Sequence, residues 1–204
     1  MVEYGYDKAS QRWGSSVIGD LENTYRLLWA NKRSYQYGVL RHICETIKDG
    51  DSIIDVGCFN GHYLNRIRNG TKKKFKYLGT DVTPAFIERA KVVNAKDANA
   101  SFEVGDIFNL KYHDNAFDLV ICSGVLIHLP EIARPISELG RISRRDLIML
   151  VQDAPKTVNA PYNGFLNWYF SEDDMRSAIS GAGLTLTRTI SPQAKYKIYH
   201  CTKS

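Results

Sequence analysis

Glycines and carboxylates follow the strand-like apolar runs of this sequence at positions where they could hold a small polar ligand. The first run ends in the turn Asp55–Gly61, in which Gly57 allows a ligand close to the backbone and Gly61 allows the next helix close to the strand. The second run ends at Asp81, whose carboxylate suits a ribose diol. The third ends in Gly105-Asp106-Ile107, where a carboxylate able to accept from an adenine amino group stands beside an apolar residue. The turn alone would suit any nucleotide cofactor.

The fourth apolar run, 117–122, ends in Ser123-Gly124-Val125, small residues that leave room above a sheet. Open α/β sheets bind their ligands outside the carboxyl ends of the strands, so these four strand ends are expected to line one site. Their order along the chain is more specific than the glycines by themselves. No metal site or disulfide framework is predicted, because the four cysteines form no CxxC pair and have no His at ligand spacing.

The elements that position these residues follow from the alternation of apolar runs and helical patterns after about residue 50. Strands are expected at 52–56, 75–79, 101–104, 117–122 and 147–151, with helices between them, one of them at 61–68. This alternation predicts βαβ units and a parallel sheet. Two later runs, 184–190 and 195–201, predict an antiparallel pair at one side of that sheet.

One domain is expected over 1–204, because no repeat or flexible linker divides the chain. Residues 1–50 are expected to form a helical lid or cap, and 51–204 the core. Tyr37, Leu40, Cys44 and Ile47 recur on one face of a predicted helix, which ends at Lys48-Asp49-Gly50.

The segment from Ser52 to about Gly183 resembles the class I S-adenosylmethionine-dependent methyltransferases, close to their small-molecule branch. The motifs that carry the resemblance cover roughly two thirds of the chain. They are the first motif at 55–61, the acidic strand end at Asp81, the adenine motif at 105–107, the motif after strand four at 117–129, and a late pattern at 168–184.

The resemblance implies a Rossmann-like α/β three-layer sandwich, with a mostly parallel seven-stranded sheet and an antiparallel strand near the C-terminus. It implies S-adenosylmethionine as cofactor and S-adenosylhomocysteine as product. The backbone of the turn would lie beneath the methionine part, Asp81 would take the ribose hydroxyls, and Asp106 the adenine amino edge. The residues assigned to the cofactor are Asp55, Gly57, Cys58, Phe59, Gly61, Asp81, Val82, Asp106, Ile107, Ser123 and Gly124. Phe59 replaces the family's middle glycine, a change that relatives tolerate.

His128 follows strand four, where a nucleophile would approach the methyl group, and a neutral imidazole could take a proton from a hydroxyl. The alternative is a histidine at a helix entry, bonded to backbone before Pro130. The resemblance also implies that the aromatic N-terminal segment closes over the cofactor and that 158–169 shapes the acceptor pocket. The residues expected to contact the acceptor are Trp29, Arg33, Tyr162, Asn163 and Trp168.

The predicted activity is methyl transfer to an oxygen or nitrogen of a small molecule by in-line displacement, with the chain aligning acceptor and sulfonium. Two alternatives stay open: a methyltransferase acting on RNA or protein, and a non-catalytic protein that binds S-adenosylmethionine. A nicotinamide-dependent oxidoreductase is disfavoured, because its Tyr-xxx-Lys pair occurs only at Tyr4 and Lys8, before the strands begin.

Composition narrows the partners. The net charge of +5 is modest, and the basic run at 72–76 is interpreted as a solvated approach to a strand, so a nucleic-acid partner is not expected. There is no apolar run of bilayer length and no basic-then-apolar signal pattern, so no membrane partner is expected. A cytoplasmic protein, monomeric or homodimeric, is therefore predicted.

Overall fold

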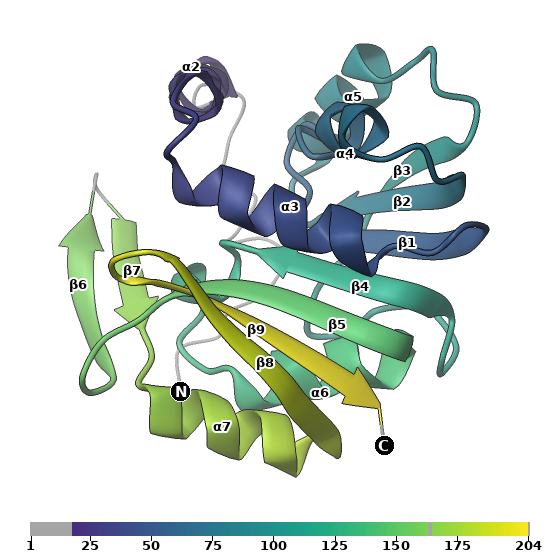
Figure 1. Cartoon of the computed structure of the whole chain (residues 1–204). Coiled ribbons are helices and arrows are strands. Elements are labelled where there is room, and N and C mark those ends of the chain that lie inside the picture. Colours follow the sequence, from purple (N-terminus) through teal and green to yellow (C-terminus); the bar gives the residue numbers. More distant parts are fainter. Residues whose placement is uncertain (1–17, 163–164, 204) are drawn as a thin grey trace.

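The computed structural model describes residues 18–162 and 165–203, and its centre is a seven-stranded sheet in the order β3-β2-β1-β4-β5-β9-β8 (Figure 1). In chain order, the strands of this sheet are β1 (Asp51–Val56), β2 (Phe75–Asp81), β3 (Ala100–Val104), β4 (Phe117–Ser123), β5 (Ser143–Gln152), β8 (Leu184–Gln193) and β9 (Tyr196–Lys203). The first five strands are mutually parallel, and β9 is antiparallel to both β5 and β8. The predicted sheet, including its antiparallel C-terminal pair, is confirmed.

Helices cover both faces of the sheet (Figure 1). On one face lie α3 (Tyr35–Thr46), α4 (Leu64–Gly70) and α5 (Pro84–Val93), and on the other lie α6 (Ala133–Ile142) and α7 (Glu172–Gly181). A further helix, α2 (Ile18–Ala30), lies beside the carboxyl edge of the sheet, and a short 3-10 turn, η2 (Leu126–His128), follows β4. The predicted three-layer sandwich is confirmed.

The central strands are buried on both faces, which explains why they appear in the sequence as continuous apolar runs rather than alternating ones. In β1, Ile54 joins the cluster beneath α6 and α7, whereas Ile53 joins the cluster beneath α3 and α4. Residues of β4 divide in the same way, with Val120 on the first side and Leu119 on the second. Successive side chains of a strand point to opposite faces, so each run supplies two separate cores.

The residues predicted to share one face of α3 all pack against the core, but those within the helix are not its most buried residues. Val39 and Ile43 are fully buried against the sheet, whereas Tyr37, Leu40 and Cys44 are only partly buried. The reason is that α3 is covered on its flank as well: Tyr37 packs edge-on against Trp29 of α2, so apolar residues occupy two faces of the helix. Ile47, the last residue of the predicted face, is buried at the C-cap.

The helix predicted at 61–68 begins only at Leu64, because 60–63 form turns that bring the chain back over the sheet. The segment 158–169 contains two strands that were not predicted, β6 (Val158–Tyr162) and β7 (Phe165–Tyr169), which pair antiparallel with Tyr162 opposite Phe165. The sequence signal for this hairpin is the Asn-Gly dipeptide at 163–164, a frequent two-residue loop between paired strands. Within the described residues, no helix is long and apolar enough to cross a membrane.

The core beneath α6 gives a test of this packing. Leu139 is fully buried, so Leu139→Ala is expected to lower the free energy of unfolding by about 2–5 kcal/mol through lost burial and a residual cavity. Val92 on α5 is 68% exposed, and Val92→Ala is expected to change the free energy of unfolding by less than about 0.5 kcal/mol. Urea denaturation followed by circular dichroism measures both, and equal effects of the two substitutions would contradict the described packing.

Candidate active site

The turn after β1 is anchored to the end of β2. Backbone N–H groups of Gly57 and Cys58 both donate to the carbonyl oxygen of Thr80, at 2.7 and 3.0 Å. Gly57 has a φ of +80°, and a Cβ placed there would lie 2.1 Å from a methyl carbon of Val125. Glycine is therefore required by both the backbone conformation and the close approach of the segment after β4.

Phe59 adopts a left-handed conformation, with a φ of 53°, although it is not glycine. Its backbone N–H donates to the carboxylate of Asp81 at 3.1 Å, and its ring packs edge-on against Phe86, with centroids 4.7 Å apart. The phenylalanine at the family's middle glycine position thus keeps a backbone conformation that glycine favours, held by one hydrogen bond and by ring packing.

Asp81 links two elements. Its second carboxylate oxygen accepts from the backbone N–H of Thr83 at 3.0 Å, next to the start of α5. Together with the bond from Phe59, this contact holds the turn after β1 and the helix after β2 around one buried side chain. The sequence predicted a ligand role for Asp81 but not this structural one.

Asp55 and Asp81 are both buried, and no ion pair joins either of them to a cation of the described residues. Burial raises the pKa of Asp55 to about 7, against a hydrogen bond from the Tyr77 hydroxyl at 2.6 Å, and the charge of Asp81 raises it further. Burial raises the pKa of Asp81 to about 6, against the backbone donors Thr83 and Phe59. The site therefore concentrates negative charge that a cationic ligand would stabilise.

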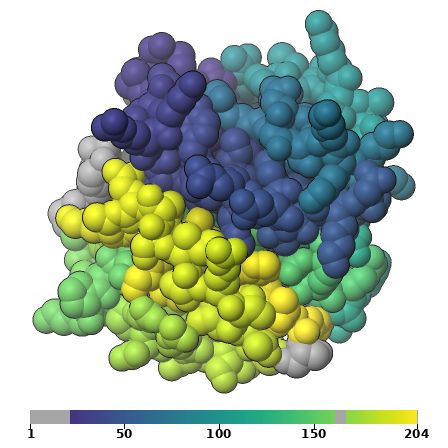
Figure 2. Space-filling model, in the orientation of Figure 1, coloured from purple at the N-terminus to yellow at the C-terminus, as the bar shows by residue number. Residues whose placement is uncertain are grey.

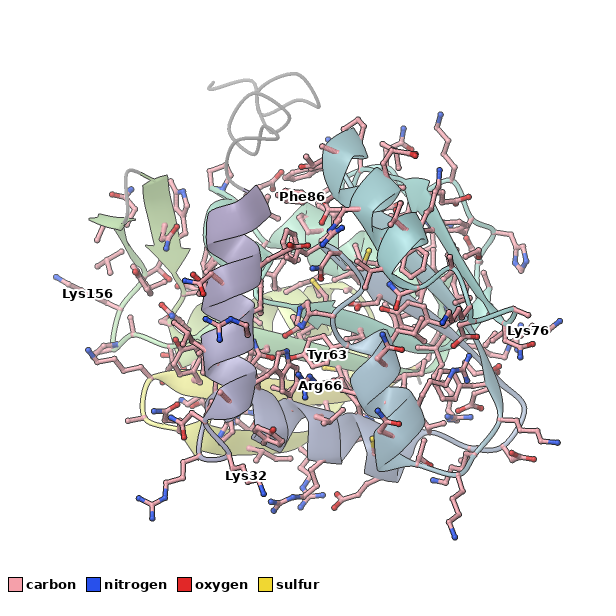
Figure 3. All side chains as sticks on the ribbon, turned by 90° about the horizontal axis from the view of Figure 1, so that it is seen from above. Lys32, Tyr63, Arg66, Lys76, Phe86 and Lys156 are labelled. Atoms are coloured by element: carbon pink, nitrogen blue, oxygen red, sulfur yellow. The ribbon has the colours of Figure 1, made fainter. Side chains whose placement is uncertain are left out.

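The end of β4 is open and is connected to α3 through buried polar groups. Gly124 has a φ of +75°, and a Cβ placed there would meet no atom within 4 Å. Beside it, the hydroxyl of Ser123 lies 3.1 Å from the Tyr63 hydroxyl, which donates to the side-chain oxygen of Gln36 on α3. Figure 3 places Tyr63 between α2 and α4. Sequence reasoning did not single out Tyr63 or Gln36, whose types carry no motif.

The other predicted cofactor residues lie around these strand ends. Asp106 is partly exposed after β3, and one of its oxygens accepts from the backbone N–H of Phe108 at 2.9 Å, which leaves the other available. Val82 is also partly exposed, whereas Ile107 is 7% exposed and packs in the core beneath α6. Cys58 is buried, and burial raises the pKa of its thiol well above the ordinary value, so it is an apolar packing residue.

Trp168, a predicted acceptor contact, lies on the same side of the site as His128, the predicted base. β7, which carries Trp168, contacts η2, which ends at His128. Both side chains are partly buried, and the backbone N–H of His128 donates to the Val125 carbonyl at 2.9 Å. Tyr162 ends β6, and Asn163 lies outside the described residues.

Trp29 and Arg33 lie elsewhere. Trp29 is 5% exposed, and its indole N–H donates at 3.2 Å to the imidazole of His62. Burial lowers the pKa of His62 to about 3, so this imidazole is neutral and its nitrogen can accept. Arg33 is exposed between α2 and α3 and lines a separate groove.

α2 lies over the turn after β1 (Figure 1). Tyr25 stacks on Phe59 and His62, with ring centroids 5.4 and 4.1 Å away, and Glu22 accepts hydrogen bonds from Asn60 and Arg89. Burial, followed by the charges of the two carboxylates, raises the pKa of the Tyr25 phenol to about 12. The phenol therefore faces the same buried negative charge that the strand ends create.

Comparison with known proteins agrees with this fold and site. Residues 47–176, well over half of the chain, match a family model described as a methyltransferase domain. The chain belongs to this family, and the predicted resemblance is confirmed.

Curated relatives share only part of their length with this chain. A tRNA U34 carboxymethyltransferase of Campylobacter curvus is 33% identical over 93 residues, which cover 45% of this chain and 30% of that protein. A 2-methyl-6-phytyl-1,4-hydroquinone methyltransferase of Synechocystis is 28% identical over 109 residues, 53% of this chain and 34% of that protein. The chain thus spans about a third of the length of these relatives.

Solved structures share the fold. Magnesium protoporphyrin IX methyltransferase from Synechocystis, solved with bound SAM, has a TM-score of 0.65 and 21% identity, covering 83% of this chain and 78% of that one. A SAM-dependent methyltransferase from Methanosarcina mazei has a TM-score of 0.66 and 16% identity, covering 79% of this chain and 96% of that one. At these identities the likeness concerns the fold alone.

The raised pKa of Asp55 predicts a specific dependence of stability on pH. Between about pH 4 and 7 the native carboxyl keeps a proton that the unfolded chain releases, so its contribution to the free energy of unfolding falls as pH rises. Asp55→Asn removes this loss while keeping an acceptor for Tyr77. As pH rises from about 4 to 7, the free energy of unfolding of the variant minus that of wild type is therefore expected to increase by about 1–3 kcal/mol.

Urea titrations at several pH values measure this difference. Asp173→Asn, at an exposed position on α7, is the matched control and is expected to leave the pH profile of wild type unchanged. A constant difference between Asp55→Asn and wild type from pH 4 to 7 would contradict the raised pKa.

Proposed function

We propose that this chain binds S-adenosylmethionine at the carboxyl edge of the sheet and transfers its methyl group to an oxygen or nitrogen of a small molecule. The observation that carries this proposal is the buried pair Asp55 and Asp81, which has no ion pair with a cation of the described residues. The cofactor brings a sulfonium and an ammonium group, and these positive charges would stabilise the two carboxylates. Membership of the methyltransferase domain family supports the same cofactor.

The residues present fit this cofactor. The carboxylate of Asp81 accepts backbone hydrogen bonds from Phe59 and Thr83 on different oxygens, and as a charged acceptor at the end of β2 it suits the ribose hydroxyls. The free oxygen of Asp106 suits the adenine amino group, beside Val82. Gly124 borders open space in which a side chain would intrude, near Ser123. We assign the cofactor to these residues and to the backbone of the turn at 57–61.

When bound, the cofactor supplies an electrophilic methyl group, and the residues of the chain align the acceptor and exclude water. α2 covers the turn through Tyr25, and the β6–β7 hairpin covers η2 on the other side. We assign to His128 the removal of a proton from an acceptor hydroxyl by a ring nitrogen. A more acidic acceptor would not require this step, and His128 would then only border the pocket.

A small acceptor is favoured by the side chains next to His128. Trp168 packs against the core from β7, and its indole nitrogen is buried with no hydrogen-bond partner among the described residues. An amphipathic aromatic wall of this kind suits a planar organic molecule with an acceptor oxygen. The names of two relatives, a hydroquinone and a protoporphyrin methyltransferase, point to the same class.

RNA is the second candidate acceptor, because other relatives are named tRNA U34 carboxymethyltransferases. The absence of a nucleic-acid partner is therefore still a prediction. The cytoplasmic location, the monomeric or homodimeric state, and the division into a cap at 1–50 and a core at 51–204 are predictions as well. The contacts of Trp29 and Arg33 with the acceptor also remain predictions.

Calorimetry tests the cofactor assignment. Wild type is expected to bind S-adenosylmethionine and S-adenosylhomocysteine with one site, and Asp81→Asn to weaken both about tenfold or more, since a charged acceptor for the ribose is lost. The exposed Asp173→Asn is expected to bind as wild type does. Unchanged affinity of Asp81→Asn would remove the ribose role, and no binding by wild type would refute the proposal.

Turnover tests the role of His128. Methyl transfer from radiolabelled S-adenosylmethionine to a panel of phenols, carboxylic acids and amines identifies an acceptor. With a phenolic acceptor, His128→Ala is expected to lower turnover by about 10²- to 10⁴-fold and to leave cofactor affinity nearly intact. The exposed His113→Ala serves as control. Undiminished turnover in His128→Ala would exclude it as the base.

A further inference from the structure

A groove of about 400 Å³ lies between α3 and β8, and it shares no residue with the proposed cofactor site. Figure 2 shows the surfaces of α3 and of the β8–β9 hairpin side by side on one face of the molecule. The α3 side contributes Gly38 and Arg41, and the β8 side contributes Arg188 and Pro192. β8 is one of the two edge strands of the sheet.

The groove is strongly basic. Lys32 and Arg33 line the end where α3 begins, and Arg41 and Arg188 line the part farther along the helix. All four side chains are exposed, and none of them forms an ion pair within the residues that the structure describes. Glu45 is the single carboxylate among the described residues of the lining. Four cations that face one carboxylate, with no structural partners, favour an anionic ligand.

Two buried polar side chains in the same lining also have unused hydrogen-bonding atoms. Ser34 is 7% exposed and His42 is 5% exposed. The hydroxyl oxygen of Ser34 and Nδ1 of His42 have no hydrogen-bond partner among the described residues. Buried polar atoms are normally paired, so these two atoms point to a partner that the described residues do not supply.

His42 stands at the end of a hydrogen-bonded chain that crosses three elements. Its Nε2 lies 3.1 Å from Nδ1 of His200 on β9, and Nε2 of His200 lies 2.8 Å from the carboxylate of Asp146 on β5. Asp146 is fixed in turn by Arg145 at 2.5 Å, and Arg145 pairs with Asp51 at 2.8 Å. This series of hydrogen-bonded side chains ends at the groove, and the proposed methyl transfer does not use it.

Depending on the protonation of these hydrogen-bonded side chains, Nδ1 of His42 offers the groove either a lone pair or an N–H. Because Asp146 accepts from His200, a neutral chain has His200 accepting from His42, and Nδ1 of His42 then carries a lone pair. One added proton lets His200 donate to His42 instead, and Nδ1 of His42 becomes a donor. The groups that face His42 are His200, Asp146, Arg188 and Glu45. Burial, His200 and Arg188 lower the pKa of His42, against Glu45 and Asp146, so His42 favours its neutral form and an anion bound beside it would favour a donor at Nδ1.

We propose that the α3–β8 groove binds a phosphate group, which Arg41 and Arg188 hold by charge and to which the hydroxyl of Ser34 and the Nδ1–H of His42 donate. A phosphate monoester or pyrophosphate carries enough charge to pair with several cations and to draw one proton onto the His42 chain. The phosphate belongs either to a small phosphorylated molecule or to an RNA backbone. This site is independent of the methyl transfer proposed above.

Calorimetry with two probes tests the site and distinguishes the two sources. Inorganic pyrophosphate represents the small ligand, and a single-stranded oligouridylate of eight nucleotides represents RNA. Arg41→Gln combined with Arg188→Gln is expected to weaken whichever probe binds by about tenfold or more. The matched control is Lys96→Gln combined with Lys156→Gln, which removes two exposed charges outside the groove and is expected to leave binding unchanged. Thermal unfolding verifies that both double variants fold.

Proton uptake tests the role of His42. Sulfate keeps its charge between pH 5.5 and 7.5, so a dependence of its binding enthalpy on the ionisation enthalpy of the buffer counts protons taken up by the protein. Wild type is expected to take up a fraction of one proton, and His42→Gln none. Binding of sulfate is also expected to tighten as pH falls in wild type only.

The outcomes decide the proposal. Binding of pyrophosphate that the groove variant weakens supports a small phosphorylated ligand, and binding of the oligonucleotide alone supports an RNA phosphate. Absence of binding of both probes, or equal affinities of wild type and the groove variant, overturns the site. Binding without proton uptake removes His42 from it. None of these results depends on S-adenosylmethionine binding, so failure here is distinct from failure of the proposed methyl transfer.

Discussion

The carboxylate of Asp81 is the contact on which the geometry of the candidate active site depends. It accepts one backbone hydrogen bond from Phe59 and another from Thr83, so the turn after β1 and the start of α5 are held around one buried side chain. Phe59 can adopt a left-handed backbone there because this bond and the packing of its ring offset the strain. Gly57 then lies against Val125, which brings the end of β4 to the same place.

The same arrangement buries two carboxyl groups whose charged forms are destabilised. Asp55 and Asp81 are buried near each other, and burial raises both pKa values, because desolvation disfavours the charged form. A cationic ligand that binds here would favour ionisation of both groups and would stabilise the native state by mass action. Negative charge at the carboxyl edge of the sheet thus links the stability of the protein to the cofactor that we propose.

α3 connects this site to the α3–β8 groove. Near its first turn, Gln36 accepts from Tyr63, whose hydroxyl also lies beside Ser123 at the end of β4. Two turns later, His42 reaches His200 and begins the polar chain to Asp146. Buried polar contacts of this kind are directional, so they define the position of α3 on the sheet more narrowly than apolar packing does. A ligand in the α3–β8 groove would contact the same helix that borders the proposed cofactor site.

The sequence by itself determined the sheet, its antiparallel C-terminal pair and the family, because periodicity and strand-end motifs are local properties of the chain. It placed the turn at 57–61 beside Asp81, since neighbouring parallel strands end at one edge. The sequence grouped Trp29 and Trp168 together as acceptor contacts, but their surroundings differ. Trp29 is buried against His62, whereas Trp168 lies in a hairpin beside η2. The inward face of α3, the pairing of Tyr63 with Gln36 and the chain from His42 to Asp146 depend on contacts between residues far apart in sequence. Only the tertiary structure decides such contacts, because a local sequence pattern does not specify which side chain of another element will lie next to a given residue.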